Sequence, residues 1–436
     1  MKRLAIEKLL YWKNQKQRKP LLLDGARQVG KTWLAERLFG GKHFQAVHKA
    51  DFLAEPRLMR IFDNGLQSTQ VIANLEISLN SKINLDSDLI LFDEVGECQQ
   101  AVNSLKYFAE DMPQAYICAT GSNIGLLGSF PVGKVEFLEL FPMCFEEFVM
   151  ASGKHLLHEA FQERHHGQVV HNELWSLLLD YYFIGGMPEA VHAWFSQDDS
   201  PLERSDAVTK IHRSLIAGYQ QDFGKYDSKQ NAGHIEAVFR NVPRQLARVM
   251  DDSVQRYVFK DVITNKRRYQ ELRGPINWLE QAKLISKCYQ IDCRPSAPLT
   301  TLAKENIFKL FLFDIGLLGY MLNMSYAEQR RQAASFKGFI AENFVQNELR
   351  TQVSYPTFSW AKARGEIEFL YKCQGGEIIP VEVKSGSRSR ARSLRTYVDR
   401  YSPKNTVKLI GTAGNEPDAG PDYVWPLYYA QYLSKL

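Results

Sequence analysis

Short apolar runs alternate with segments of helical periodicity from Pro20 to about Met150. Strand-like runs such as LLLD, DLILFDE and AYICATGS are separated by amphipathic stretches such as TWLAERLF and SLKYFAE. This alternation is typical of a parallel sheet flanked by helices, because parallel strands need long crossover connections. We therefore expect residues 1–150 to form an α/β domain with a parallel sheet.

The pattern changes after this region. Residues 151–230 contain long helical and aromatic segments, such as LWSLLLDYYF and IHRSLIAGYQQDF, which predict a helical lid or connector. Residues 301–436 mix helical and strand-like segments and predict a further α/β domain. The chain is thus expected to be a multidomain α/β protein, which agrees with its length of 436 residues.

Residues 231–300 suggest a separate small domain. Tyr269, Leu272 and Ile276 keep helical spacing and lead into the strand-like run LISKCYQI. A helix that runs into a hairpin predicts a winged helix. The alternative is a packing module that never contacts DNA, and the sequence leaves both open.

The composition, with 45% hydrophobic and 24% charged residues, is that of an ordinary globular protein. A net charge of +5 is too small to require a nucleic-acid partner. One stretch is locally basic, however, because between residues 384 and 408 only Asp399 is acidic. Its basic residues are Lys384, Arg388, Arg390, Arg392, Arg395, Arg400, Lys404 and Lys408.

The six cysteines show no CxxC spacing and are expected to be free thiols in a reducing compartment. The start of the chain has no uninterrupted apolar region like that of a signal peptide. The most apolar run, IFKLFLFDIGLLGYML, includes Lys309 and Asp314 and is shorter than the roughly 20 residues a spanning helix needs. We expect a cytoplasmic protein with no membrane contact.

The segment GARQVGKT fits the phosphate-binding loop pattern GxxxxGK[ST], with a strand before it and a helix after it. Glycines let backbone N–H groups converge on phosphate oxygens, and the helix N-terminus adds positive potential. Lys31 is expected to reach the β- and γ-phosphates of ATP, or the β-phosphate of ADP, and Thr32 to supply a hydroxyl to Mg²⁺. The expected nucleotide-binding residues are Gly25, Arg27, Gln28, Val29, Gly30, Lys31 and Thr32.

Two further strand ends carry polar groups that suit this loop. LILFDE ends in Asp93, expected to hold Mg²⁺, and in Glu94, expected to orient or deprotonate the attacking water. AYICATGSN ends in Thr120, Ser122 and Asn123, where a polar group such as that of Ser122 would sense the γ-phosphate. Simple capping of the strand end is the alternative for this last group.

The chain resembles the bacterial and archaeal AAA-like ATPases that carry an N-terminal P-loop domain and a C-terminal domain of unknown function. The motifs that carry the resemblance are GARQVGKT, LILFDEV, ATGSN, KVEFLELFPMCFEEFV, FDIGLL, GFIAENFVQNEL and IPVEVKSG, in this order. The resemblance implies an AAA-like sheet and an ATPase that uses ATP and Mg²⁺. Where the family usually has Gly-Arg, this chain has Gly133-Lys134, so Arg27 is an alternative charge-stabilising group.

A second candidate site lies in GEIEFLYKCQGGEIIPVEVKSG, which reads as two strands joined by Gln374-Gly375-Gly376. Strand alternation places Glu366 and Glu368 on one face of the first strand, and Glu382 and Lys384 together on one face of the second. This hairpin resembles that of restriction-endonuclease-like nucleases, whose carboxylates hold Mg²⁺ and whose lysine assists the nucleophile.

Helical spacing also places Glu342 among apolar neighbours, where an isolated charge would be costly. The implied metal ligands are therefore Glu342, Glu368 and Glu382, and the implied catalytic groups are Glu382 and Lys384. The usual Asp of the nuclease pattern is Glu368 here, and a degenerate domain that binds DNA or protein is the alternative to an active nuclease.

These observations predict a P-loop ATPase domain (1–150), a helical connector (151–230), a winged helix (231–300) and a nuclease-like domain (301–436). The function expected is an Mg²⁺-dependent ATPase that couples nucleotide binding to the binding or processing of nucleic acid, with DNA as the candidate partner. The alternative is a nucleotide-dependent switch that binds a protein partner or self-associates and has an inactive C-terminal domain.

Overall fold

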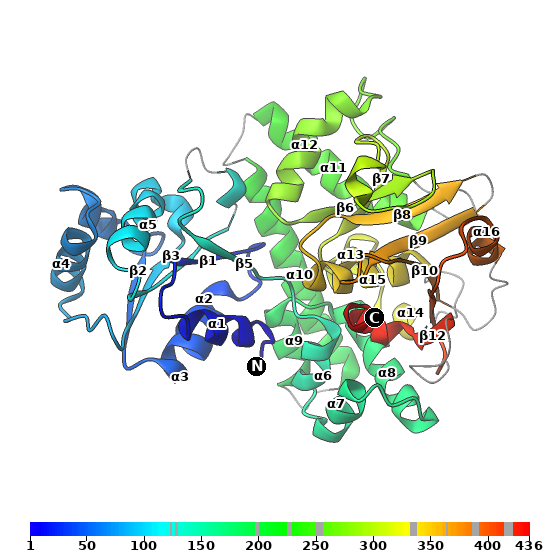
Figure 1. The fold of residues 1–436 in the computed structure, drawn as a ribbon, viewed down its shortest axis with the longest axis horizontal. Coiled ribbons are helices and arrows are strands. Elements are labelled where there is room, and N and C mark those ends of the chain that lie inside the picture. The colour runs from blue at the N-terminus through cyan, green and yellow to red at the C-terminus, as the bar shows by residue number, and fades with distance from the viewer. Residues whose placement is uncertain are drawn as a thin grey trace. The chain divides into compact units, whose positions relative to one another are not determined.

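The computed structural model describes residues 1–122, 124–126, 130–196, 200–224, 229–248, 256–331, 338–362, 365–385, 392–413 and 422–436. The chain forms two compact units (Figure 1). Unit 1 comprises Met1–Phe141 and Gln281–Lys283, and unit 2 comprises Pro142–Glu280 and Leu284–Leu436. Among the helices of the described residues, none has the length and apolar character needed to cross a bilayer.

Unit 1 is built on a parallel five-stranded sheet in the order β2-β3-β4-β1-β5. The buried strands agree with a parallel sheet covered on both faces, as the alternating pattern predicted. Its strands are β1 (Leu21–Asp24), β2 (Val47–Asp51), β3 (Leu89–Asp93), β4 (Tyr116–Thr120) and β5 (Glu136–Glu139). Its helical segments are α1 (Ala5–Lys13), α2 (Lys31–Trp33), the π-helical η1 (Leu34–Gly40), α3 (Gly41–His43), η2 (Pro56–Phe62), α4 (Ser68–Leu79), η3 (Val95–Glu97), α5 (Gln99–Asp111) and η4 (Ile124–Leu126).

An apolar core fixes the end of β3 that carries the candidate carboxylates. Helix α5 buries Val102, Leu105 and Phe108 at helical spacing. Phe92 of β3 lies edge-on to Phe108, with ring centroids 6.0 Å apart. Asp93, the next residue, is therefore held at a defined position at the carboxyl end of the strand.

Unit 2 contains a mixed seven-stranded sheet in the order β12-β11-β10-β9-β8-β6-β7. Its strands are β6 (Ile285–Ile291), β7 (Phe308–Leu312), β8 (Thr357–Lys362), β9 (Gly365–Lys372), β10 (Ile378–Lys384), β11 (Thr406–Ile410) and β12 (Asp422–Pro426). Its helical segments are α6 (Phe145–Ala151), α7 (His155–Gln162), α8 (Gln168–Ile184), α9 (Pro188–Phe195), α10 (Pro201–Phe223), α11 (Lys229–Ala247), α12 (Tyr269–Gln281, whose last residue groups with unit 1), η5 (Leu299–Thr301), α13 (Ile315–Met321), α14 (Tyr326–Arg331), α15 (Gly338–Gln352), α16 (Arg392–Tyr401) and η7 (Leu427–Lys435).

Helices α15 and α16 pack on opposite faces of this sheet. Thr357 Oγ1 of β8 donates a hydrogen bond to Gln346 Oε1 of α15 at 2.9 Å. Trp360, three residues further along β8, lies edge-on to Tyr397 of α16 with ring centroids 5.1 Å apart. Because neighbouring strand residues face opposite sides, the two helices cover different faces, and Glu342 of α15 lies on the face of Thr357.

The winged helix expected at residues 231–300 is not confirmed. The local pattern is present, since α12 leads into β6 and β6 pairs antiparallel with β7. However, β6 also pairs in parallel with β8, where Cys288 is opposite Thr357. The hairpin is therefore the edge of the large sheet, and the division of unit 2 at residues 230 and 300 stays a prediction.

Candidate functional site

The loop Gly25–Lys31 joins β1 to α2 with a backbone that requires glycine. Gly25 has a φ of +151° and Gly30 a φ of +89°, which side chains disfavour. A Cβ on Gly25 would also lie 2.3 Å from the carbonyl oxygen of Leu140. Gln28 adopts a φ of +64° at the outer turn of the loop. The first glycine therefore allows the loop to pack directly on the chain that follows β5.

Lys31 is buried inside the loop, with only 5% of its surface exposed. Its Nζ donates hydrogen bonds to Gly25 O at 3.0 Å, Ala26 O at 2.8 Å and Ser122 Oγ at 2.9 Å. Burial lowers the pKa of Lys31 to about 8, and the nearby carboxylate of Glu94 opposes part of that shift. Ser122, which follows β4, thus lies against the loop lysine, and its expected role toward the γ-phosphate stays a prediction.

Thr32, Asp93 and Thr120 meet at a single carboxylate oxygen. Thr32 Oγ1 donates a hydrogen bond to Asp93 Oδ1 at 2.9 Å, and Thr120 Oγ1 donates to the same oxygen. Asp93 is buried. The hydroxyl and the carboxylate expected to serve Mg²⁺ are therefore neighbours, and both are hard oxygen ligands of the kind this ion prefers.

Glu94 directly follows Asp93 with a φ of +51°, so its side chain leaves the strand in a new direction. Burial raises the pKa of its carboxyl group, while the Lys31 ammonium partly lowers it. A carboxylate of raised pKa next to a phosphate loop is a suitable proton acceptor for water.

Arg27 and Lys134, the two candidates for the charge-stabilising group, have different surroundings. Arg27 is half-buried, and its charge lowers the pKa values of both Lys31 and Glu94, which places its guanidinium group near them. Lys134 forms a partly exposed ion pair with Glu110 at 2.8 Å. Asn123 lies outside the described residues.

Sequence reasoning missed a cation beside Asp93. Lys49 Nζ of β2 lies 3.2 Å from Glu36 Oε2, 3.6 Å from Asp51 Oδ2 and 3.9 Å from Asp93 Oδ2. The signal was the alternating polar pattern of VHKAD in a strand that pairs with β3, where Asp51 is opposite Asp93. Lys49 thus offsets part of the negative charge at the carboxyl ends of these strands.

In the C-terminal sheet, β9 and β10 form the predicted antiparallel hairpin, with Val381 opposite Phe369. The turn closes through Gly376 N, which donates to Cys373 O at 3.0 Å. A bulge interrupts the ladder between β9 and β8, because Trp360 pairs with Ile367 although Phe358 pairs with Leu370. Strict alternation therefore does not hold along β9.

Each lysine of this region contacts two of the four glutamates. Lys309 Nζ of β7 lies 2.7 Å from Glu366 Oε1 and 3.1 Å from Glu342 Oε2. Lys384 Nζ lies 3.1 Å from Glu368 Oε1 and 3.7 Å from Glu382 Oε1. We call these two lysines and four glutamates the Glu–Lys cluster. Lys384 thus contacts two of the glutamates that the sequence singled out, and Lys309 is the member that sequence reasoning missed.

Burial and charge shift the ionisation of this cluster. Burial disfavours the ammonium of Lys309, yet the carboxylates of Glu342 and Glu366 raise its pKa above the ordinary value. Glu382 is 1% exposed, and its Oε2 has no hydrogen-bond partner among the described residues. Burial raises the pKa of Glu382, although Lys384 partly opposes this.

Residues 17–149 match the family model of an AAA domain. This segment is AAA-like. The match supports a nucleotide-binding P-loop ATPase, which agrees with the parallel sheet and with the loop around Lys31. Residues 176–328 match a domain of unknown function (DUF8612), and residues 337–431 match another (DUF4143). No curated protein matches the chain.

The AAA-like segment followed by a C-terminal domain of unknown function agrees with the arrangement that the sequence motifs implied. A restriction-endonuclease-like identity of the DUF4143 segment is not confirmed. The seven-stranded sheet spans both later segments, because β6 and β7 fall in the DUF8612 segment and β8–β12 in the DUF4143 segment. The Glu–Lys cluster therefore takes Lys309 from one segment and its other members from the other.

Among the described residues, no group of three His, Cys, Asp or Glu side chains is arranged to hold a metal ion. In the Glu–Lys cluster, ammonium groups contact the carboxylates instead. The predicted ligand set of Glu342, Glu368 and Glu382 thus stays a prediction. Of the basic stretch after Lys384, Arg388 and Arg390 lie outside the described residues, and Arg395, Arg400 and Lys404 are exposed.

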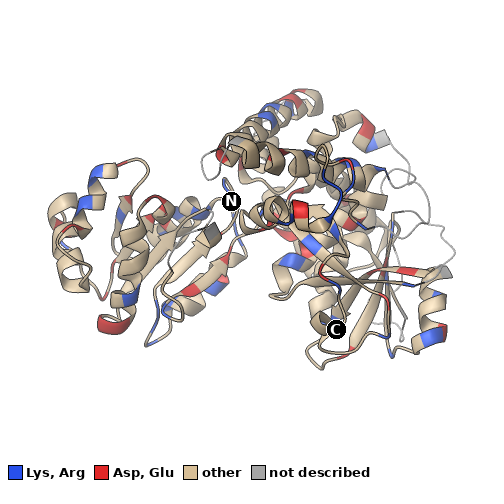
Figure 2. Cartoon of the chain, turned by 90° about the horizontal axis from the view of Figure 1, so that it is seen from above, with Lys and Arg blue, Asp and Glu red and all other residues tan. Residues whose placement is uncertain are grey.

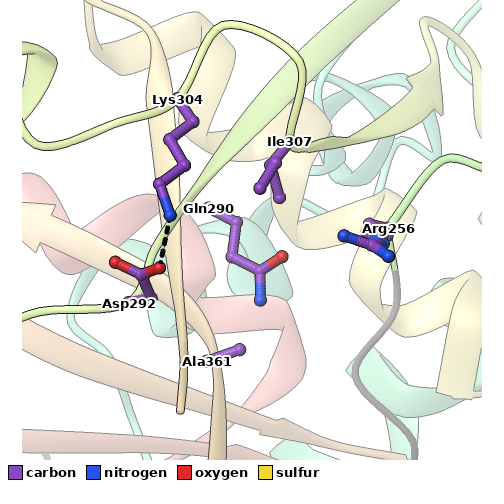
Figure 3. A pocket seen from close by; sticks show the side chains of 6 residues that line it. All are labelled: Arg256, Gln290, Asp292, Lys304, Ile307 and Ala361. Carbon is purple, nitrogen blue, oxygen red and sulfur yellow. Dashed lines mark hydrogen bonds and ion pairs between the residues drawn. The ribbon is translucent and has the colours of Figure 1, made fainter. Parts of the chain in front are cut away.

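Basic and acidic positions are interspersed along the elements of both units (Figure 2). A pocket of about 300 Å³ in unit 2 is lined by Arg256 and by one ion pair, between Lys304 Nζ and Asp292 Oδ2 at 2.7 Å. Gln290 points into this pocket from β6 (Figure 3). None of the predicted site residues is among the described residues that line this pocket.

Proposed function

We propose that the chain is an Mg²⁺-dependent ATPase whose reaction takes place at the P-loop of the AAA-like domain. The observation that carries this proposal is the meeting of Lys31, Thr32 and Asp93 around one loop, with Glu94 beside them. The family match supports nucleotide binding at the same place.

Each residue has a distinct role in this proposal. Backbone N–H groups of the loop and the ammonium of Lys31 bind the phosphates. Thr32 and Asp93, whose oxygens are 2.9 Å apart, hold Mg²⁺, which when bound offsets charge on the phosphate oxygens. Glu94 accepts a proton from the attacking water, a role that its raised pKa favours. Ser122, which contacts Lys31, orients the γ-phosphate.

The test compares ATP binding and turnover in wild type, Lys31→Ala, Glu94→Gln and the exposed control Glu97→Gln. Lys31→Ala should lose binding, whereas Glu94→Gln should bind ATP but turn it over at least about 100-fold more slowly, because a general base is removed. Glu97→Gln should match wild type. A wild type without turnover, or a fully active Glu94→Gln variant, would contradict the proposal.

A second candidate function, metal-dependent cleavage of nucleic acid, has two observations in its favour. Glu382 Oε2 is a buried carboxylate oxygen with no partner among the described residues. The Glu–Lys cluster also contains four carboxylates and two ammonium groups. An excess of two negative charges suits one divalent cation, held by Glu382 with Glu368 and Glu342.

Such a cation, when bound, would activate a water molecule and stabilise the attacked phosphate, and Lys384 would orient Glu368 and Glu382. In the alternative function, the same region is an inactive surface that a protein partner recognises under the control of ATP.

Plasmid cleavage with Mg²⁺ or Mn²⁺ separates these functions. Glu382→Gln should lose cleavage and keep ATP turnover, whereas Glu377→Gln in the hairpin turn should keep both. If DNA is the partner, it should also raise ATP turnover and bind in a strongly salt-dependent way. Intact plasmid under both metals, with no effect of DNA on turnover, would favour the protein-binding alternative.

A further inference from the structure

Arg3 joins the nucleotide loop to the residue at which the chain leaves unit 1. Its side chain is buried, with 4% exposed. Nη1 donates a hydrogen bond to Val29 O at 2.8 Å, and Nη2 donates to Phe141 O at 2.7 Å. The planar guanidinium fork thus bridges two backbone carbonyls that are far apart in the sequence.

The N-terminal end of the loop, at Gly25, contacts Leu140, which directly precedes Phe141. Leu140 N donates to Asp24 O, the residue before Gly25, at 2.7 Å. A Cβ on Gly25 would meet the carbonyl oxygen of Leu140 at 2.3 Å, so the loop and Leu140 lie in direct contact. Both ends of the loop are therefore tied to Leu140 and Phe141.

The following residues are anchored in unit 2. Met143 N donates to Gly186 O at 2.7 Å, and Tyr181 OH donates to Met143 O at 2.6 Å. Phe145 N donates to Glu348 Oε1 at 2.9 Å. We call Leu140–Phe145 the connector; it is distinct from the helical segment 151–230. Its first two residues form hydrogen bonds within unit 1, and Met143 and Phe145 form hydrogen bonds within unit 2.

We propose that Arg3 is a positioning residue for the nucleotide loop and transmits the state of that loop to the connector. Phosphate binding draws the loop N–H groups together, and this moves the peptide of Val29. Because Arg3 holds Val29 O and Phe141 O with one rigid group, a shift at Val29 displaces Phe141. The coupling has a contiguous physical carrier in these hydrogen bonds and the covalent chain.

This inference rests on the proposed ATPase function and is tested in the full chain with Arg3→Gln, Arg3→Lys, Lys31→Ala and a matched control. The control is Arg18→Gln. Arg18 is 8% exposed; its Nη1 donates to Gln114 O at 2.6 Å, its Nη2 donates to Gln15 O, and its guanidinium group lies over the ring of Tyr116. The readouts are ATP affinity and hydrogen exchange of the connector amides Met143 and Phe145, with and without ATP·Mg²⁺.

In wild type, saturating ATP should slow exchange of the connector amides. Arg3→Gln should weaken ATP binding about tenfold, because charge-assisted hydrogen bonds to the loop are lost, and should abolish the change in exchange even at saturating ATP. Arg3→Lys keeps the charge but cannot bridge both carbonyls, so it should recover affinity only in part and leave the connector unresponsive. Arg18→Gln should keep both responses.

An Arg3→Gln variant with wild-type affinity and a wild-type exchange response would overturn the inference. Equal losses in Arg18→Gln would also overturn it, because they would point to general destabilisation. Lys31→Ala distinguishes a failure of the ATPase proposal from a failure of the inference about Arg3. If wild type binds no ATP, the ATPase proposal and this inference both fail; if wild type binds ATP and Lys31→Ala does not, an unchanged Arg3→Gln rejects this inference alone.

Discussion

At the scale of single residues, burial changes the acidity of two groups in ways that experiments can detect. Lys31 is enclosed by the carbonyls of its own loop, and burial lowers its pKa to about 8. Glu348 is 1% exposed and accepts a hydrogen bond from Phe145 N, and burial raises its pKa to about 8. Each group therefore titrates near neutral pH, although neither does so in an unfolded chain.

The first prediction concerns Lys31. In the free protein this amine loses its proton as the pH rises through about 8, and bound phosphate favours the protonated form. ATP affinity should therefore fall about tenfold between pH 8 and pH 9.5, and binding should take up about half a proton at pH 8, rising to close to one proton at pH 9.5. Calorimetric titration in two buffers of different ionisation enthalpy measures this uptake, and a pH-independent affinity would contradict it.

The second prediction concerns Glu348, whose folded pKa lies above the unfolded value of 4.5. The folded state therefore binds the extra proton, so this group contributes stability that is fully present below pH 4.5 and is lost as the pH rises through about 8. Phe145 N, Glu146, Glu147, Tyr181, Tyr182 and Cys144 surround the carboxyl group.

Glu348→Gln keeps an oxygen for Phe145 N and removes the titration. Between pH 6 and pH 8, wild type should lose about 2 kcal/mol of stability relative to this variant. Denaturant unfolding of the full chain at both pH values measures the difference, with the exposed Glu328→Gln as control. Parallel pH profiles for wild type and Glu348→Gln would refute the prediction.

At the scale of elements, the hairpin β9–β10 depends on one backbone position in its turn. Gly376 has a φ of +82°, whereas Gly375 has no such restriction, and a Cβ on either would meet nothing within 4 Å. The two glycines therefore differ in backbone conformation and not in available space. Comparing alanine substitutions at these two positions therefore measures the free-energy cost of the left-handed conformation without any contribution from a steric clash.

The third prediction follows from this difference. Gly376→Ala should lower the free energy of unfolding by about 1 kcal/mol, because an L-residue pays for the left-handed conformation. Gly375→Ala should leave stability unchanged or slightly higher. Denaturant unfolding of both variants measures the effect, and equal losses would show that the turn does not impose this conformation.

Local sequence patterns predicted the strands and loops that carry both sites. They could not predict contacts that depend on pairing or packing between distant parts of the chain. The P-loop and the ends of β3 and β4 were readable, because each motif specifies its own short geometry. Lys309 was not, because it sits in the apolar run FKLFLFD and reaches Glu342 only through packing of β7 against α15. Similarly, the sequence pattern of α12, β6 and β7 resembles that of a winged helix. Only the pairing of β6 with β8 shows that the β6–β7 hairpin belongs to the large sheet.

At the scale of the whole molecule, the two compact units are expected to differ in their response to nucleotide. The P-loop residues lie within Met1–Phe141, whereas the seven-stranded sheet belongs to the second unit. A ligand that binds only the folded form stabilises the unit that holds it, by about 2.7 kcal/mol at 100 times its Kd.

The fourth prediction is that calorimetry resolves two transitions and that ATP·Mg²⁺ raises the temperature of one more than the other. The shift should vanish in Lys31→Ala, while both transitions remain. A single transition that moves as a whole with ATP would show instead that the units unfold as one cooperative structure.

The order of strands along the chain also has a consequence for synthesis. All five strands of the first sheet precede residue 140, and its edge strand β5 is the last of them. The second sheet requires Cys288 to pair with Thr357, a contact between distant parts of the chain. We therefore expect that a growing polypeptide can pair the five strands of its P-loop sheet on the ribosome while most of the other unit is still untranslated.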